Sequence, residues 1–139
     1  MGNDVEDCFR RILAGESGIR RITLFDVSDY KVTIGGDVVD FDASKFIEPR
    51  ELKRVDRFTQ FGLVAAGQAI RDAEIISDQL DRNRCGVILG SGIGGLITIE
   101  EQMAKLLYKG PDRVSPLTIP KLMLNAAGAH IAAPASGRR

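Results

Sequence analysis

The sequence Cys85-Gly-Val-Ile-Leu89 runs directly into the glycine-rich segment Gly90-Ser-Gly-Ile-Gly-Gly95. A short apolar run that ends in glycines is typical of a buried strand. In residues 96–108 apolar side chains alternate with glutamates and a lysine, and Gly110-Pro111 follows, so this pattern predicts an amphipathic helix that ends there. A strand, a glycine turn and a helix in this order indicate an α/β protein.

The glycine segment also matches the turn of a dinucleotide-binding domain. Gly90, Gly92 and Gly95 have the G-x-G-x-x-G spacing. Such a site needs an acidic residue at the end of a second strand, about 20 residues further on, to bind the ribose hydroxyls. The acid nearest that place is Asp112, which lies between a helix stop and two prolines. The pattern therefore favours glycines that allow a tight turn or a close approach of helix and strand, with a nucleotide-binding α/β domain as the alternative.

Helical periodicity marks three other segments. Residues 4–14 are predicted to form a first helix, with Asn3 and Glu6 as a candidate capping pair. A proline followed by good helix formers predicts one continuous helix over residues 50–73. Small residues predict a last helix over residues 121–132.

Strands are predicted in the region before the long helix. The apolar runs there cover residues 22–25, 31–34 and 38–41, and Gly35-Gly36 lies between the last two. A glycine pair between two such runs can close a hairpin.

Composition excludes several classes of protein. The chain has 139 residues, enough for one domain with an ordinary core, and 44% hydrophobic and 27% charged residues, which disfavours disorder. Its 19 basic and 19 acidic residues balance, so nothing indicates nucleic-acid binding. No secretory signal or apolar run of membrane-spanning length is visible, and Cys8 and Cys85 have no metal-ligand spacing. We expect a cytoplasmic protein with two reduced, buried thiols.

Two further features are candidate sites. Arg50, Lys53, Arg54 and Arg57 recur at i, i+3, i+4 and i+7, so on one helix they would form a basic face, either solvated or able to dock an acidic partner. His130 is the only histidine and has no nucleophile beside it in the sequence, so we predict a packing or surface role.

Several motifs distributed along the chain point to a known family. In order they are Gly2-Asn-Asp-Val5, Leu13-Ala-Gly-Glu-Ser-Gly-Ile19, Phe25-Asp-Val-Ser-Asp29, Asp56-Arg-Phe-Thr-Gln-Phe61, Gly90-Ser-Gly-Ile-Gly-Gly-Leu96, Gly110-Pro111 and Val114-Ser-Pro116. Together they resemble the beta-ketoacyl-acyl-carrier-protein synthases, synthase II in particular. The resemblance implies an α/β chain that is an incomplete N-terminal half of a thiolase-like α/β/α/β/α fold, normally a homodimer. It also implies a decarboxylative condensation in fatty-acid synthesis, with acyl carrier protein as partner and no cofactor.

The resemblance assigns roles to six residues. Arg50, Lys53 and Arg54 correspond to the basic helix that receives the acidic carrier protein. Ile93 corresponds to an isoleucine of the acyl pocket. Leu117 and Thr118 follow Pro116 where the family typically has Pro-Phe-Phe, a stretch that contributes to the same pocket.

The resemblance also implies that catalytic residues are absent. Residues 1–132 match a partial N-terminal synthase domain, whereas residues 133–139 form a divergent tail. Cys8, Cys85 and His130 match neither the family's nucleophilic cysteine nor its two catalytic histidines. We therefore expect this chain to be a truncated portion that does not catalyse condensation alone. The alternative within the family is a non-catalytic module that binds the carrier protein.

Overall fold

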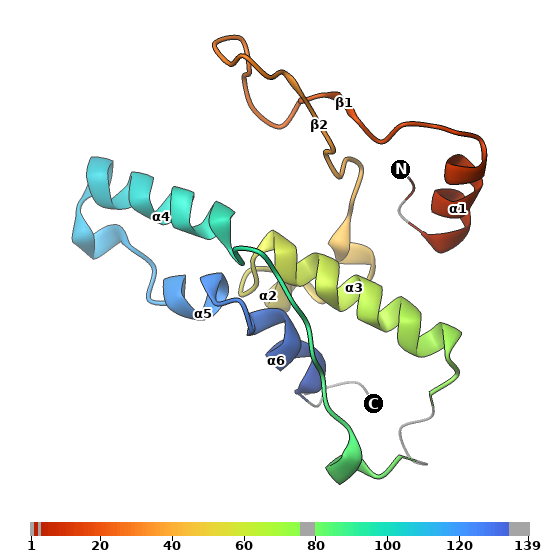
Figure 1. Cartoon of the computed structure of the whole chain (residues 1–139). Coiled ribbons are helices and arrows are strands. Elements are labelled where there is room, and N and C mark those ends of the chain that lie inside the picture. The colour runs from red at the N-terminus through yellow and green to blue at the C-terminus, as the bar shows by residue number, and fades with distance from the viewer. Residues whose placement is uncertain (1, 3, 76–79, 134–139) are drawn as a thin grey trace. The chain divides into compact units, whose positions relative to one another are not determined.

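The computed structural model describes residues 2, 4–75 and 80–133 (Figure 1). The chain divides into two compact units, Met1–Asp42 and Ala43–Arg139. The first unit holds one helix and a small sheet, and the second holds the remaining helices. The described residues are thus mainly helical.

The first unit begins with helix α1, Val5–Leu13. The carboxylate of Asp4 caps it by accepting a hydrogen bond of 2.8 Å from the backbone N–H of Asp7. Gly15 follows the helix in the left-handed region, at φ 69°, where glycine carries no steric cost. The predicted helix over 4–14 is confirmed to within a residue at each end, although Asp4 is the cap and Asn3 lies outside the described residues.

Ion pairs between side chains on its exposed face stabilise α1. The Arg11 guanidinium donates to Asp7 over 2.9 Å, and this hydrogen bond is the largest cause of a pKa of Asp7 below its usual value. Arg10 also pairs with Asp7. The acidic first turn and basic last turn complement the helix dipole.

The sheet of the first unit is a short antiparallel pair. Strand β1, Arg20–Arg21, pairs with strand β2, Ile34–Gly35. Gly35 therefore lies within a strand and does not close a hairpin, which corrects the prediction for the glycine pair. Its role is to make room, because a Cβ at Gly35 would lie 3.1 Å from Cγ1 of Ile22.

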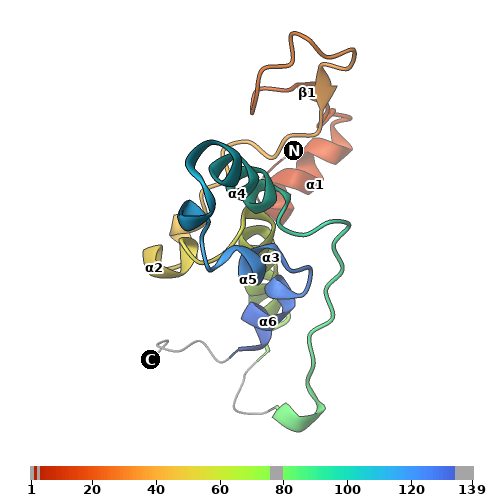
Figure 2. The same ribbon diagram turned by 90° about the vertical axis from the view of Figure 1, so that its left-hand side faces the viewer.

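The second unit is an array of helices. In chain order these are η1 (Ala43–Lys45), α2 (Pro49–Leu52), α3 (Arg57–Asp72), η3 (Arg82–Arg84), α4 (Leu96–Lys109), η4 (Pro111–Arg113), α5 (Thr118–Leu122) and α6 (Ala126–Ala132). Helix α6 packs against α3, and α5 packs against α4; Figures 1 and 2 show both pairs side by side. The predicted helix over 96–108 is confirmed, and it ends at Gly110.

The long helix predicted over residues 50–73 is interrupted. Asp56 has extended backbone dihedrals, φ −75° and ψ 162°, and its carboxylate accepts from the N–H of Phe58 at 3.2 Å. Aspartate is a strong N-cap residue, so a new helix begins after it. The last predicted helix is also divided, because Met123 has extended backbone between α5 and α6.

The predicted strand over residues 85–89 is not formed. Within residues 80–133 no strand is present, and Ile88 of this run is fully exposed. A strand needs a neighbour to pair its backbone N–H and C=O groups, and the described residues supply none beside this run. A layered α/β arrangement is accordingly absent from the part of the chain that the structure describes.

The core of the second unit is small and partly polar. The apolar side chains buried there belong to Ala43, Ile47, Val55, Val64, Ala126 and Ala127. Asp56, Thr59, Thr98 and Gln102 are buried with them. Long apolar side chains of α4 stay exposed, such as Met103 at 51% and Leu107 at 69%.

Thr59 is the one buried polar side chain for which the described residues offer no hydrogen-bond partner. Its fully buried hydroxyl carries a desolvation penalty of about 1–3 kcal/mol. We therefore expect Thr59→Val, which keeps the shape and removes the hydroxyl, to raise the free energy of unfolding by about 1 kcal/mol in urea denaturation. A lower stability for this variant would show that the hydroxyl has a partner.

None of the helices in the described residues is long and apolar enough to cross a lipid bilayer. The cytoplasmic location stays a prediction.

Candidate functional site: the glycine loop and the Asp56–Thr98 clasp

The end of the glycine segment is packed tightly against helix α5. The N–H of Gly95 donates to the carbonyl of Leu122 at 3.1 Å. A Cβ at Gly94 would lie 2.6 Å from that carbonyl oxygen, and one at Gly95 would lie 2.7 Å from Cα of Leu122. Gly94 also has a φ of 87°. The glycines thus permit a close approach, as predicted, although the neighbour is a helix rather than a strand.

The two earlier glycines have no such role. A Cβ at Gly90 or Gly92 would meet no atom within 4 Å. The packing requirement is therefore confined to the last two residues of the segment.

A buried carboxylate lies at the N-terminus of α4. Oδ2 of Asp56 accepts hydrogen bonds from the backbone N–H of Thr98 at 2.9 Å and from its hydroxyl at 2.5 Å. Both residues are buried, with exposures of 5% and 4%. We call this pair the Asp56–Thr98 clasp. It joins the start of α3 to the first turn of α4.

The clasp argues against a nucleotide at this turn. A phosphate would bind the free N–H groups at the helix N-terminus. Here the N–H of Gly95 donates to Leu122, that of Leu96 to Gly94, and that of Thr98 to Asp56. A phosphate would have to displace a buried carboxylate of its own charge.

The structure brings the predicted acyl-pocket residues onto adjoining elements. Ile93 lies in the glycine segment, one residue before Gly94, and is 62% exposed. Leu117 precedes α5 and Thr118 opens it, with the Thr118 hydroxyl donating to the Ser115 carbonyl at 2.5 Å. The loop contacts the far end of α5, so Ile93 and the other two residues are linked through that helix.

Helix α4 holds α5 at both ends. The Oε1 atom of the buried Gln102 accepts from the N–H of Ser115 at 2.8 Å, just before α5. The bond between Gly95 and Leu122 fixes the other end. The segments that carry the three predicted pocket residues are therefore attached to one helix.

The basic residues are divided by the break at Asp56. Arg50 lies in α2, while Lys53 and Arg54 follow it in a turn, and all three are exposed. Arg57 instead begins α3 and lies 5.1 Å from the ring of Phe61. The prediction of four cations on one helical face is therefore wrong. The first three form what we call the basic turn.

Hydrogen bonds fix the backbone of the basic turn. The N–H of Arg54 donates to the Glu51 carbonyl at 2.8 Å. The ammonium of Lys121, in α5, donates to the Lys53 carbonyl at 3.3 Å. The basic turn is thus tied to the same helix that supports the glycine loop.

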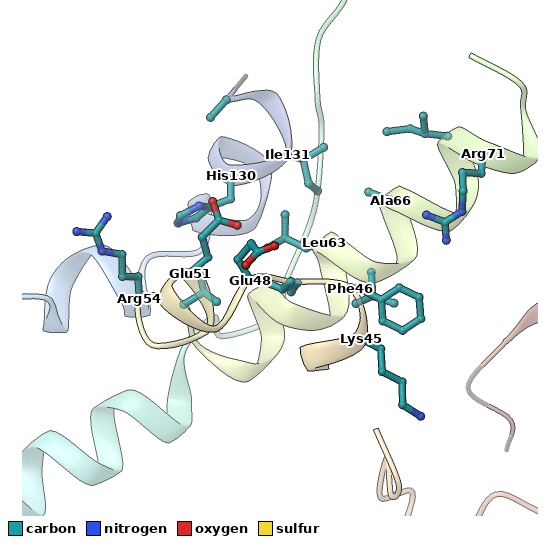
Figure 3. Close-up of a pocket in the computed structure, with 16 residues that line it drawn as sticks. Lys45, Phe46, Glu48, Glu51, Arg54, Leu63, Ala66, Arg71, His130 and Ile131 are labelled. Carbon is teal, nitrogen blue, oxygen red and sulfur yellow. The ribbon is translucent and has the colours of Figure 1, made fainter. Parts of the chain in front are cut away.

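A groove of about 610 Å³ lies between α2, α3 and α6. Figure 3 shows Arg54, Glu48, Glu51 and His130 toward one end and Arg71 toward the other. Exposed His130 agrees with the surface role predicted for it. Side chains of both signs line the groove, so its charge selects no ligand.

No set of side chains in the described residues is arranged to bind a metal ion. Cys8 is half-buried and Cys85 is exposed, so the prediction of two buried thiols is wrong. Cys85 is exposed rather than buried, because the run that carries it does not pair as a strand.

The buried polar residues of this site are not predicted from the sequence. The helix predicted over residues 50–73 contains Asp56, although an aspartate before a run of helix formers is an N-cap signal. No local signal marks Thr98 or Gln102, whose partners are 42 and 13 residues away in the sequence.

The chain matches the family model "Beta-ketoacyl synthase, N-terminal domain" over residues 1–135. It is 44% identical over 127 residues to a 3-oxoacyl-[acyl-carrier-protein] synthase 2 of Synechocystis sp., covering 91% of this chain and 30% of that protein. It is 39% identical over 131 residues to the synthase 2 of Staphylococcus aureus, covering 94% of this chain and 32% of that protein. The chain thus spans about a third of the length of these relatives.

Two solved structures that resemble this chain contain ketosynthases. The ishigamide ketosynthase/chain length factor superposes with a TM-score of 0.78 at 26% identity, covering 94% of this chain and 33% of that chain. A type II PKS acyl-carrier protein in complex with its ketosynthase bound to the hexaketide gives a TM-score of 0.64 at 28% identity, covering 68% and 27%. The chain belongs to the beta-ketoacyl synthase family and matches its N-terminal domain.

Proposed function

We propose that this chain contributes to a 3-oxoacyl-acyl-carrier-protein synthase, which condenses an acyl thioester with malonyl-carrier protein in fatty-acid synthesis. The similarity to two synthases along more than nine tenths of the chain carries the proposal. In this reaction an acyl group is transferred to a cysteine and is then attacked by the carbanion that decarboxylation releases. Cys8, Cys85 and His130 match none of the residues for these steps, so we expect no condensation by the chain alone.

Other residues of this chain can serve a different part of the reaction, the delivery of the acyl chain. Ile93 on the glycine loop, with Leu117 and Thr118 at the start of α5, would form one wall of the acyl pocket. Ile93 and Leu117 present exposed apolar surface, 62% and 42%, which an acyl chain would cover. A thiolase-like layered sheet would complete the other walls, with assembly as a homodimer.

The basic turn would dock the carrier protein. Arg50, Lys53 and Arg54 are exposed cations on a turn whose backbone is fixed by hydrogen bonds, so little order is lost when an acidic surface binds. One structural neighbour is an acyl-carrier protein in complex with its ketosynthase. The same interaction is our proposal for this chain.

We expect the triple variant Arg50→Glu, Lys53→Glu, Arg54→Glu to weaken carrier binding at least about tenfold, because exposed ion pairs contribute roughly 0.2–1 kcal/mol each and the variant also adds repulsion. Isothermal titration with purified acyl carrier protein measures the affinity. The matched control is Lys105→Glu, Lys109→Glu, Arg113→Glu, which makes the same change in net charge near the far end of α4. An equal loss of affinity in both variants would show that net charge alone causes the effect. Unchanged binding in the first variant would refute the docking site.

A further inference from the structure

We propose that Asp56 is a positioning residue for the acyl pocket, because its carboxylate holds the glycine loop and therefore the direction in which Ile93 is presented. This inference rests on the proposed role of Ile93. It gives a role to the buried carboxylate of Asp56, which the proposed delivery of the acyl chain leaves without one.

One carboxylate serves two helices at once. Oδ1 of Asp56 accepts from the N–H of Phe58, in the first turn of α3, and Oδ2 accepts both donors of Thr98, in the first turn of α4. These are charge-assisted hydrogen bonds in a buried place, where each is stronger than its equivalent at the surface. The clasp therefore fixes the start of α4 relative to the start of α3.

The glycine loop is held at the point where it enters α4. A Cβ on Gly95 would lie 3.0 Å from Oδ2 of Asp56, so the backbone there lies directly beside the carboxylate. The N–H of Gly95 also donates to the Leu122 carbonyl. Ile93 lies two residues earlier and is 62% exposed, so its direction follows the backbone of this loop.

The same residue borders the basic turn. Asp56 follows Arg54 by two positions, and a cavity of about 270 Å³ beside the clasp is lined by Asp56, Thr98 and Lys121, the residue that donates to the Lys53 carbonyl. The clasp is thus the buried connection between the segment proposed to dock the carrier and the loop proposed to meet its acyl chain.

The chemistry of the clasp requires a carboxylate. Asp56 uses both oxygens as acceptors, whereas the amide of asparagine has one acceptor oxygen and two donors. In Asp56→Asn the amide nitrogen would face either the N–H of Phe58 or the donors of Thr98. An isosteric variant therefore loses either the hydrogen bond to Phe58 or those to Thr98, without creating a cavity.

The test is NMR of the whole chain, with Ile93 labelled at its δ1 methyl and glycines labelled at nitrogen. We expect Asp56→Asn to shift the Ile93 methyl and the Gly94 and Gly95 amides. Val64→Ala is the control, because it removes buried apolar volume from α3 away from the clasp and should leave these signals in place. Asp56→Asn signals that stay at their wild-type positions, or an equal shift in Val64→Ala, would overturn the proposal.

A second pair keeps the test independent of the folding of Asp56→Asn. Thr98→Ser keeps the hydroxyl that donates to Asp56, and Thr98→Val removes it at nearly constant volume. We expect the three loop signals to shift in Thr98→Val and to return toward wild type in Thr98→Ser. Identical spectra for both variants would contradict a role for the clasp.

A further titration separates this inference from the proposed function. Octanoyl-pantetheine added to the wild-type chain should shift the Ile93 methyl if the loop meets an acyl chain. An unchanged methyl would refute a contact between this loop and an acyl chain, whereas the response of the loop to Asp56→Asn would still decide whether Asp56 positions it.

Discussion

Gly95→Ala is expected to lower the free energy of unfolding by about 3 kcal/mol, the upper end of what overpacking usually costs. The added methyl would lie 2.7 Å from Cα of Leu122 and 2.9 Å from the carbonyl oxygen of Lys121. Both are backbone atoms, so relief requires movement of α5 or of the loop. The φ of Gly95 is −79°, so the loss would be steric rather than conformational. Urea denaturation followed by circular dichroism measures it.

Gly90→Ala is the matched control, because nothing lies within 4 Å of the added methyl. We expect it to change stability little. In a dinucleotide-binding turn all the glycines of the pattern are needed, the first of them for the tight turn. A large loss at Gly90, or none at Gly95, would therefore contradict our interpretation of the loop as a segment packed on α5.

Ala127→Leu is expected to cost about 2–3 kcal/mol through overpacking at the contact between α3 and α6. Ala127 is fully buried and lies opposite Gly62, at which a Cβ would come within 3.2 Å of the Ala127 Cβ. The larger side chain would force the two helices apart. Thermal unfolding of the purified chain measures the effect as a lower Tm.

Ala129→Leu provides the comparison on the same helix. Ala129 is exposed on α6, and leucine and alanine both favour helix, so we expect a small change. Similar losses at the two positions would mean that α6 does not pack against α3 in solution through Ala127.

The sequence predicts the elements whose signals are local. The periodicity of residues 4–14 and 96–108 gave α1 and α4 nearly to the residue, because one helical face repeats every three or four positions. The family, too, follows from motifs quoted along the chain and is confirmed by the match over residues 1–135.

Features that depend on distant neighbours could not be predicted in the same way. The run at 85–89 has the composition of a buried strand, but a strand forms only beside another. The break before α3 depends on Asp56 acting as a cap, and the second partner of that carboxylate, Thr98, lies 42 residues further along. The break at Asp56 is also the reason why the four cations at helical spacing do not share one helical face.

We propose that a carrier protein docked on the basic turn presents its acyl chain to the glycine loop. Photo-crosslinking tests it most directly, with acyl carrier protein loaded with an acyl chain that ends in a diazirine and mass spectrometry to locate the label. We predict labelling of residues 91–95 and 115–118, lost when Arg50, Lys53 and Arg54 are changed to glutamate. Labelling confined to the groove between α2, α3 and α6, or labelling that survives this change, would contradict this proposal.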